Sequence, residues 1–262
     1  MKQTLFFIIW CVGFCACSVD TGLKPLQSGF SGRIAFQNDW PEATDQVVVV
    51  AAKKFPPAEI TDIVMGEPLP LFQDTVHYAI YSAPITFRAI GVIWKEKGQA
   101  WDVTNVIGYY FKGDDLFNPE SVVIRNREQM IESVDIVADL SKAKRSVQSG
   151  ISGKLVVKQP WPAQAESVIM IASESFPPKG LLDLQFSPPI AAGFNSIHYE
   201  FNLQPKTYRL IGTLLLGKDI PISLQSVAGV YLKQGDLFAS PVTIASDTSW
   251  VDNIDIPLYF TQ

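Results

Sequence analysis

Residues Ser28–Pro57 read SGFSGRIAFQNDWPEATDQVVVVAAKKFPP, and residues Ser149–Pro178 read SGISGKLVVKQPWPAQAESVIMIASESFPP. The two stretches align without a gap at an offset of 121 residues. The same offset relates Asp115–Phe117 to Asp236–Phe238, both of which read DLF. A match of this length at a fixed period indicates an internal duplication. We therefore interpret the chain as two copies of one unit.

The duplication also indicates where the units begin and end. VDI at Val134–Ile136 meets IDI at Ile254–Ile256 at an offset of 120, so one residue is lost late in the second copy. The polar, basic stretch SKAKRSVQSG between the copies is typical of a linker. We predict a lipoprotein signal peptide (1–16), a tether (17–29), a first β-sandwich domain (30–140), a linker (141–149) and a second β-sandwich domain (150–262).

Each copy consists of short runs rich in β-branched and aromatic residues, such as QVVVVAA and SVIMIAS, separated by Pro, Gly, Asn and Asp. No segment keeps a helical period, although the stretches that follow each FPP could hold a short helical turn or an irregular crossover. About seven strands in a unit of this size indicate a β-sandwich. The predicted fold is all-β, with two tandem antiparallel sandwiches of approximately seven strands each.

The N-terminus has the features of a bacterial lipoprotein signal. Lys2 precedes an apolar run, Leu5–Phe14, which is too short to span a bilayer comfortably. The run leads into FCAC, which ends at Cys17 and resembles the lipobox, in which a small residue precedes the lipidated cysteine. The resemblance implies that Cys17 is the mature N-terminus and anchors the chain to a membrane through acyl chains. Ordinary secretion and an uncleaved anchor are the alternatives.

One part of the unit resembles a known family of domains. The second copy reaches a strand through an L-P-x-T-Y-R pattern made of Leu203, Pro205, Thr207, Tyr208 and Arg209. This pattern, with the opening SG strand, resembles the transthyretin-like (prealbumin-like) sandwich of carboxypeptidase regulatory-like domains. Members of that family are mostly spacers, adhesive modules or accessory domains without catalytic residues. Ile85 and Lys206 stand where the family has Gly, so an immunoglobulin-like sandwich of another topology is the alternative.

Composition excludes several classes of site. The net charge is −5 with no long basic run, so nucleic acid is not an expected partner. All three cysteines lie at or before Cys17, which excludes disulfides and zinc–thiolate sites from the rest of the chain. No G-x-S-x-G motif or acid–base pair is evident, and we expect neither enzymatic activity nor a cofactor.

The charged residues at matched positions are interpreted as structural. His77 and His198 are the two histidines of the chain, and we expect each to hydrogen-bond a turn or to cap a sheet edge rather than to bind metal. Asp115 and Asp236 are expected to accept backbone N–H bonds in turns rather than to hold calcium.

Two arginines recur in the middle of matched strands, at Arg88 and Arg209. A repeated arginine in a strand is more often paired with an acid than free to bind an anion. We therefore predict ion pairs with the matched carboxylates Asp135 and Asp255.

The aromatic residues divide into matched and unmatched positions. Trp40 and Trp161 are matched and are expected to close one end of each sandwich. Trp94, Trp101, Tyr109 and Trp250 have no aromatic counterpart in the other copy. Exposed rings could stack on a sugar or dock a partner protein, so these four are the candidate ligand-binding residues; rings folded back onto the sheets are the alternative.

The sequence thus predicts a non-enzymatic lipoprotein of the bacterial cell envelope, on the periplasmic or cell-surface face. It would act as a binding, adhesion or spacer module at the membrane to which Cys17 anchors it. Its further partners would be a protein or a glycan. The alternative function is that of a carbohydrate-binding accessory lipoprotein that uses exposed tryptophans.

Overall fold

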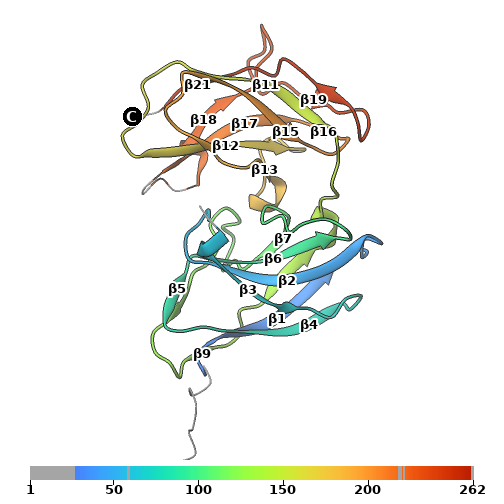
Figure 1. The fold of residues 1–262 in the computed structure, drawn as a ribbon, viewed down its shortest axis with the longest axis vertical. Helices are drawn as coiled ribbons and strands as arrows, with labels where there is room; N and C mark the ends of the chain where they lie inside the picture. The colour runs from blue at the N-terminus through green and yellow to red at the C-terminus, as the bar shows by residue number, and fades with distance from the viewer. Residues whose placement is uncertain (1–26, 58–59, 218–219, 221, 261–262) are drawn as a thin grey trace, which may run out of the picture.

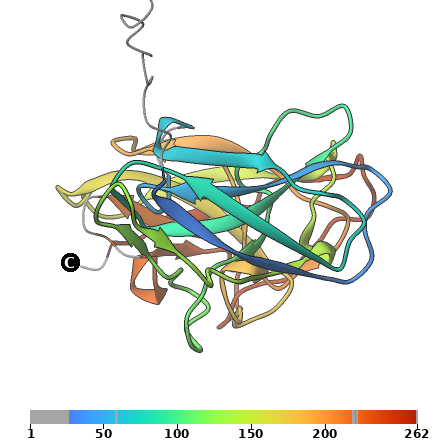
Figure 2. The same ribbon diagram turned by 90° about the horizontal axis from the view of Figure 1, so that it is seen from below.

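The structure is a computed structural model that describes residues 27–57, 60–217, 220 and 222–260. Strands of the first half of the chain and strands of the second half form two β-structures stacked along the long axis (Figure 1). Figure 2 looks along the stacking direction and shows the first half in front of the second. The predicted signal peptide, Cys17 and most of the tether lie outside the described residues.

The described part of the first half contains ten strands that form two four-stranded sheets and one ribbon. The sheets have the orders β10-β1-β4, with β9 also paired to β1, and β3-β2-β6-β7; the ribbon is β5-β8. The strands are β1 (Gly29–Gln37), β2 (Thr44–Ala52), β3 (Ile63–Pro68), β4 (Thr75–Tyr81), β5 (Ile85–Phe87), β6 (Ala89–Glu96), β7 (Val106–Tyr109), β8 (Val122–Ile124), β9 (Met130–Ile131) and β10 (Ile136–Asp139).

The second half repeats this plan with the sheets β15-β11-β20, to which β21 is added, and β13-β12-β17-β18, to which β14 is added; the ribbon is β16-β19. Its strands are β11 (Gly150–Val157), β12 (Ala165–Ser173), β13 (Gln185–Phe186), β14 (Ile190–Ala191), β15 (Ser196–Asn202), β16 (Thr207–Tyr208), β17 (Leu210–Gly217), β18 (Val227–Val230), β19 (Val242–Thr243), β20 (Trp250–Val251) and β21 (Ile256–Leu258). The prediction of an all-β sandwich fold is confirmed.

The helical segments of the described chain are single 3-10 turns, and none of them has the length and apolar character needed to cross a membrane. They are η1 (Ile60–Asp62), η2 (Leu140–Lys142), η3 (Leu181–Asp183) and η4 (Leu224–Ser226). η1 and η3 follow the two FPP motifs, so the first alternative proposed for those stretches, a short helical turn, is correct.

Alternation of side chains places the core of each half between its two sheets. In β2, Val47, Val49 and Ala51 are at most 1% exposed and belong to the core of the first half. Successive residues of a strand point to opposite faces, so Val48 and Val50 lie on the outer face. Val48 is nevertheless only 2% exposed. The outer face of this sheet is therefore covered as well, whereas the outer face of many antiparallel sheets is in contact with solvent.

The closing strands differ from the antiparallel arrangement that the sequence predicted. β1 pairs in parallel with β9 and then with β10, and β11 pairs in parallel with β20 and β21. Ser133 lies between β9 and β10 with a φ of 62°, in the left-handed region. A Cβ at Gly32 would lie 2.1 Å from the Val134 carbonyl oxygen, so the return of the chain along β1 requires glycine there.

A pair of hydrogen bonds fixes this return in both halves. The Tyr78 hydroxyl donates to the Val134 carbonyl at 2.6 Å, and the Tyr199 hydroxyl donates to the Ile254 carbonyl at the same distance. Burial raises the pKa of both tyrosines above its ordinary value because the charged form would lose its hydration.

The matched carboxylates Asp135 and Asp255 serve the same return. Asp135 accepts the backbone N–H of Arg33, and Asp255 accepts that of Lys154, each at 2.8 Å. No ion pair joins Arg88 to Asp135, or its counterpart to Asp255, within the part of the chain that the structure describes. The predicted ion pairs are therefore wrong, because each carboxylate instead caps a backbone donor of the strand beside it.

Candidate functional site

The two halves meet through an apolar cluster on the outer face of the β13-β12-β17-β18 sheet. Its fully buried members include residues of β12, β17 and the η3 region: Ile169, Ile171, Leu181, Leu184, Leu210 and Leu214. Aromatic side chains of the first half pack against them: Phe55, Tyr109, Phe111 and Phe117. The outer sheet face of the second half is thus buried by the first half, which joins the two sandwiches into one body.

Close contacts at η3 interlock the halves. The backbone N–H of Leu181 donates to the carbonyl of Leu116 at 2.9 Å. A Cβ at Gly180 would lie 2.7 Å from the Leu116 Cβ, so this approach is open to glycine alone. Lys142 adds an ion pair to Asp183 across the junction at 2.9 Å.

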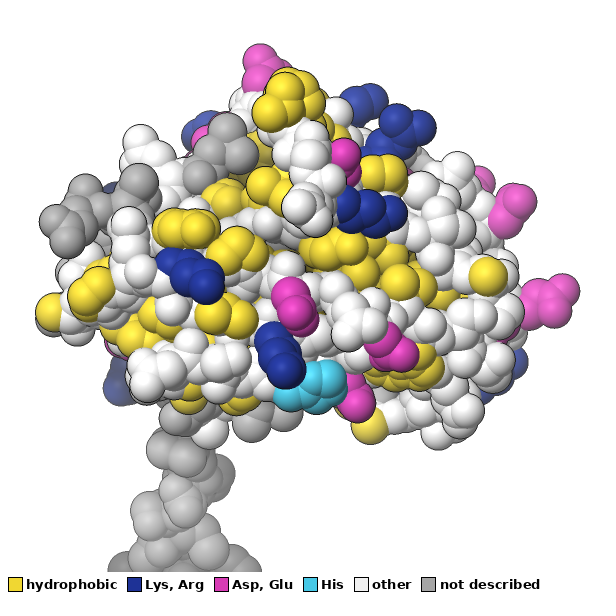
Figure 3. Space-filling model, turned by 90° about the horizontal axis from the view of Figure 1, so that it is seen from above, with side chains coloured by type: hydrophobic (Ala, Val, Ile, Leu, Met, Phe, Trp, Pro, Cys, Tyr) yellow, Lys and Arg dark blue, Asp and Glu magenta, His cyan; other side chains and the backbone are white. Residues whose placement is uncertain are grey.

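The second half carries the counterparts of these docking residues, and they face solvent. We call Phe55, Phe111, Leu116 and Phe117 the docking set; the three phenyl rings are partly buried at the contact, whereas Leu116 is 43% exposed and joins the contact through its Cβ and its backbone carbonyl. At the offset of 121, their counterparts are Phe176, Leu232, Leu237 and Phe238, which we call the exposed set. The exposed set is 51%, 47%, 88% and 73% solvent-exposed in that order. Figure 3 shows one face of the molecule on which hydrophobic side chains lie open among scattered charges. Exposed apolar residues that recur as a set mark an interaction surface.

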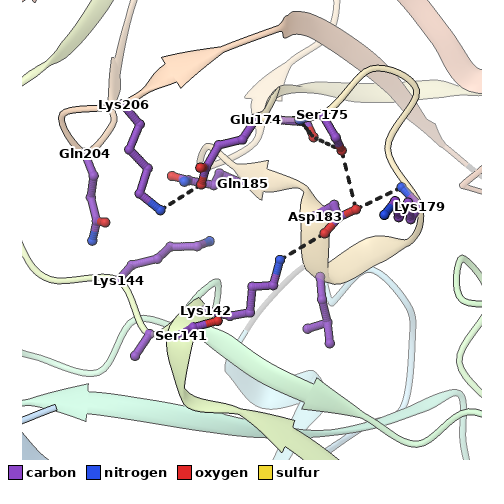
Figure 4. Close-up of a pocket in the computed structure, with 13 residues that line it drawn as sticks. Ser141, Lys142, Lys144, Glu174, Ser175, Lys179, Asp183, Gln185, Gln204 and Lys206 are labelled. Atoms are coloured by element: carbon purple, nitrogen blue, oxygen red, sulfur yellow. Dashed lines mark hydrogen bonds and ion pairs between the residues drawn. The ribbon is translucent and has the colours of Figure 1, made fainter. Parts of the chain in front are cut away.

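A polar cleft opens beside the interface, between the linker and the second half (Figure 4). Its volume is about 420 Å³. The residues that line it come from η2 and the linker, from the stretch that runs from the end of β12 through η3 to β13, and from the turn between β15 and β16: Ser141, Lys142, Ala143, Lys144, Ser173, Glu174, Ser175, Lys179, Leu182, Asp183, Gln185, Gln204 and Lys206.

The charges of the cleft are unequally paired. Lys206 binds Glu174 at 2.7 Å, and Lys142 binds Asp183. Although burial opposes it, the hydrogen bonds from the Lys142 ammonium and from the Lys179 backbone N–H hold the pKa of Asp183 below its ordinary value. With four lysines and two carboxylates, the cleft has an excess of positive charge in a chain whose net charge is negative.

Lys144 extends into the cleft between Lys142 and Lys206 in the view of Figure 4. Its ammonium group donates to the Thr104 carbonyl at 3.1 Å and has no carboxylate within ion-pair distance among the described residues. Burial lowers the pKa of Lys144 to about 8, against a smaller opposing effect of the Asp102 charge. Mutual hydrogen bonds between Asn105 and the Lys144 backbone, at 2.8 and 2.9 Å, fix the position of the residue.

Gln204 adds an unused donor to the same cleft. Its amide Nε2 is buried and has no hydrogen-bond partner among the described residues. Gln185, on the neighbouring wall, donates to the Tyr208 hydroxyl at 3.2 Å. A second pocket of about 420 Å³ continues from these residues and shares Lys144, Gln185 and Gln204 with the cleft.

Two of the four candidate ligand-binding aromatics pack against other parts of the protein. Trp94 is completely buried in the core of the first half, where its indole N–H donates to the Thr44 hydroxyl at 2.8 Å. Tyr109 packs in the interface 5.9 Å from the ring of Phe55, and burial raises its pKa. The prediction of an exposed stacking ring is therefore wrong for Trp94, which follows the alternative of a ring folded into the core, whereas Tyr109 is half-buried against the neighbouring half and its ligand-binding role stays a prediction.

The other two candidates keep an accessible ring. Trp101 is half-buried, with the Lys95 ammonium 5.9 Å from its ring centre. Trp250 is 37% exposed, and its indole N–H donates to the Gln148 carbonyl at 2.7 Å. No ring contact joins the two tryptophans within the described chain. Trp94 and Trp101 line one pocket of about 220 Å³, which neither Tyr109 nor Trp250 lines, so the structure brings two of the four candidates together. A ligand-binding role for Trp101 and Trp250 stays a prediction.

The matched tryptophans pack as predicted. The ring of Trp40 lies 4.6 Å from that of Phe36, and the ring of Trp161 lies 4.7 Å from that of Phe260. The Trp161 indole also donates to a backbone carbonyl at 2.8 Å. Both rings therefore close an end of their half, as a large amphipathic side chain does at the rim of a core.

The matched histidines lie in the middle of exposed strand faces. His77 stands opposite Arg33 on β4, and His198 stands opposite Lys154 on β15. Both strands are edge strands of their sheets, but neither residue lies in a turn. Over the residues that the structure describes, no three His, Cys, Asp or Glu side chains are grouped so as to hold a metal ion.

The turn aspartates bind backbone and neighbouring side chains. Asp115 accepts the backbone N–H groups of Phe117 and Asn118 at 3.0 and 3.2 Å, which confirms the predicted turn role. These bonds, led by one from the Asn118 side chain, lower the pKa of Asp115. Asp236 instead accepts the hydroxyl of Ser240.

Sequence reasoning missed the residues that make the cleft and the docking set. Lys144 lies in a stretch that reads as an ordinary basic linker, and Gln204 lies in the L-P-x-T-Y-R turn, where its amide has no local signal. The DLF triplets did recur visibly at Asp115–Phe117 and Asp236–Phe238. The sequence analysis interpreted only the aspartates of these triplets, whereas it is their leucine and phenylalanine side chains that differ in exposure between the halves.

Comparison with known proteins gives no family. No protein-family model matches the chain, and no curated protein matches it. A leucine-rich repeat protein from Bacteroides thetaiotaomicron is similar with a TM-score of 0.31 and 8% identity over 87% of this chain and 26% of its own. A streptococcal ancillary pilin gives a TM-score of 0.21 at 8% identity, covering 88% and 69%. A candidate adhesin from Bacteroides ovatus gives 0.23 at 10% identity, covering 91% and 94%.

These similarities carry no argument about function because the TM-scores are too low to establish a shared fold. The chain also spans only about a quarter of the leucine-rich repeat protein. The function must therefore be argued from the interface, the exposed set and the cleft.

Proposed function

We propose that this chain is a non-enzymatic binding module of the bacterial cell envelope that is tethered by lipid on Cys17. In this proposal, its second half docks a partner protein through Phe176, Leu232, Leu237 and Phe238. The observation that supports docking most strongly is the contrast between Phe55, Phe111 and Phe117, which pack at the contact between the halves, and their counterparts Phe176, Leu232 and Phe238, which are exposed.

The docking set also indicates what kind of surface the partner presents. Phe55, Phe111 and Phe117 pack on an apolar outer sheet face, and Leu116 accepts a backbone N–H from the turn beside that face. The expected partner therefore carries a comparable apolar face on a β-sandwich. A few large apolar side chains in such a contact provide most of the binding free energy.

A second copy of this chain does not provide such a face. The outer sheet face of the second half is already covered by the first half. In the first half, the counterparts of Ile169 and Leu214 are Val48 and Ile93, which are 2% and 0% exposed. The partner is therefore a different protein.

The test compares the size of the protein extracted in mild detergent from membranes of its native host. The unchanged protein should migrate as a complex larger than its own mass, and Leu237→Asp should migrate alone. Tyr81→Asp is the control, since Tyr81 is 58% exposed on the first half, and it should keep the complex. Migration of the unchanged protein at its own mass would refute the docking role.

The anchor is tested separately. Cys17→Ser should move the protein from the membrane fraction to the soluble fraction, because the acyl chains supply the membrane affinity. Persistent membrane binding of Cys17→Ser would remove the lipid anchor from the proposal.

The docking proposal has one further outcome. If the purified, unchanged protein self-associates at micromolar concentration, the partner of the exposed set is a second copy of this chain, and the proposal of a different partner protein is wrong.

A further inference from the structure

The cleft beside the interface is built from donors that lack acceptors, and this imbalance defines a ligand. Lys144 directs an ammonium group into it, with no carboxylate partner among the described residues. The Gln204 amide is buried there with unused N–H donors. A buried donor without an acceptor destabilises the protein, so an acceptor that fills the site recovers that free energy.

The charge around these two groups favours an anion. Lys142 and Lys206 point toward the same space and are each held by one carboxylate, Asp183 and Glu174. Of the four lysines, Lys144 and the exposed Lys179 form no ion pair among the described residues, and Asp102 in the neighbouring pocket offsets the charge of Lys144 only in part. Charge-assisted hydrogen bonds from an ammonium to a carboxylate are roughly twice as strong as neutral ones.

The neighbouring pocket, which shares Lys144 and Gln204 with the cleft, is balanced in charge and only partly apolar. Arg145 and Lys144 are matched there by Asp102 and Glu200. Phe186 contributes a half-buried ring. The uncharged part of a ligand that carries several hydroxyl groups and one flat apolar face would fit this pocket, because its hydroxyl groups can bond the charged side chains and its apolar face can pack on the Phe186 ring.

We propose that the cleft and its neighbouring pocket together bind an acidic sugar. Its carboxylate lies between Lys144 and Gln204, and its ring lies in the charge-balanced pocket beside Phe186. Two connected pockets of about 420 Å³ each give room for one or two sugar units. This site is separate from the exposed set, so either can fail without the other.

The test is isothermal titration calorimetry on the full-length protein in detergent, with glucuronate, glucose and inorganic phosphate as probes. Glucuronate should bind at least about tenfold more tightly than glucose, because a charged hydrogen bond is lost with glucose. Lys144→Met should weaken glucuronate binding by a similar factor. Gln204→Leu should weaken it by roughly threefold.

Two controls keep the proposal open to refutation. Lys154→Met removes an exposed lysine of β11 away from the cleft and should leave glucuronate binding unchanged. If Lys144→Met does not fold, Lys206→Met replaces it. That change frees the Glu174 carboxylate at the rim and should weaken glucuronate binding.

Three outcomes would overturn the proposal: no heat of binding with glucuronate, equal affinity for glucose, or unchanged affinity in the folded Lys144→Met protein. Phosphate that binds more tightly than glucuronate, with the same dependence on Lys144, would replace the acidic sugar by a free oxyanion and overturn the sugar assignment.

Discussion

The two halves of this molecule share one internal plan and differ in what their outer surfaces contact. Both halves return the last strand along the first, over Gly32 in one and Gly153 in the other. Both tie that return with a buried tyrosine hydroxyl. The DLF loop of the first half is docked on the second half, whereas the DLF loop of the second half is open. The cores of the two halves are thus alike, whereas the contact surface is docked in one half and open in the other.

The largest effect should come from breaking the shared return strand. Gly153→Val would place a Cβ 2.2 Å from the Ile254 carbonyl oxygen, which the backbone can relieve only by separating the strands. We expect a loss of about 4 kcal/mol or more in the free energy of unfolding.

Gly32→Val should cost a similar amount, and Ser31→Ala on the same strand should be nearly neutral. Calorimetric melting of the three variants measures this. Normal melting of either glycine variant would show that the close approach is not required.

A smaller, symmetric effect should come from the tyrosine ties. Tyr78→Phe and Tyr199→Phe each leave a buried carbonyl without its donor, at a cost of about 1–2 kcal/mol. Chemical denaturation should give the same loss for both within error. A clear difference between them would mean that the halves do not share this feature equally.

The dependence of stability on pH should distinguish the linker lysine from the interface tyrosine. The pKa of Lys144 is about 8 in the folded chain, below its ordinary 10.5, so the unfolded chain binds more protons between these values and stability rises with pH. The pKa of Tyr109 is raised above 10.0, so the unfolded chain loses that proton first and stability falls above pH 10.

We expect the free energy of unfolding to rise by on the order of 1 kcal/mol as the pH passes from the folded to the unfolded pKa of Lys144, and we expect this rise to be absent in Lys144→Met. Melting temperatures from pH 7 to pH 11 measure it. A flat profile in the unchanged protein up to pH 10 would contradict the burial of Lys144.

The smallest effect should come from the ion pair at the rim of the cleft. Lys206 and Glu174 are 39% and 54% exposed, so Lys206→Met should change stability by no more than about 0.5 kcal/mol. A loss above about 1.5 kcal/mol by chemical denaturation would show that this pair holds the cleft together.

The sequence permitted prediction of the strands, the repeat and the packing of Trp40 and Trp161, because these follow from local pattern and duplication. Burial of Trp94 was also readable, since Ile90, Val92 and Trp94 alternate on one face of a strand. The parallel pairing of β10 with β1 could not be predicted, because the composition of a strand does not encode the direction of its partner. Lys144 and Tyr109 owe their burial to the contact between the halves, which no local pattern specifies.

The most direct test of the difference between the halves is one pair of matched variants, Phe117→Ala and Phe238→Ala, measured by equilibrium unfolding in guanidinium chloride. Phe117 packs in the interface and Phe238 is 73% exposed. We predict a loss of about 2 kcal/mol for Phe117→Ala and less than about 0.5 kcal/mol for Phe238→Ala. Equal losses, or a larger loss for Phe238→Ala, would contradict the account of one docked and one open surface.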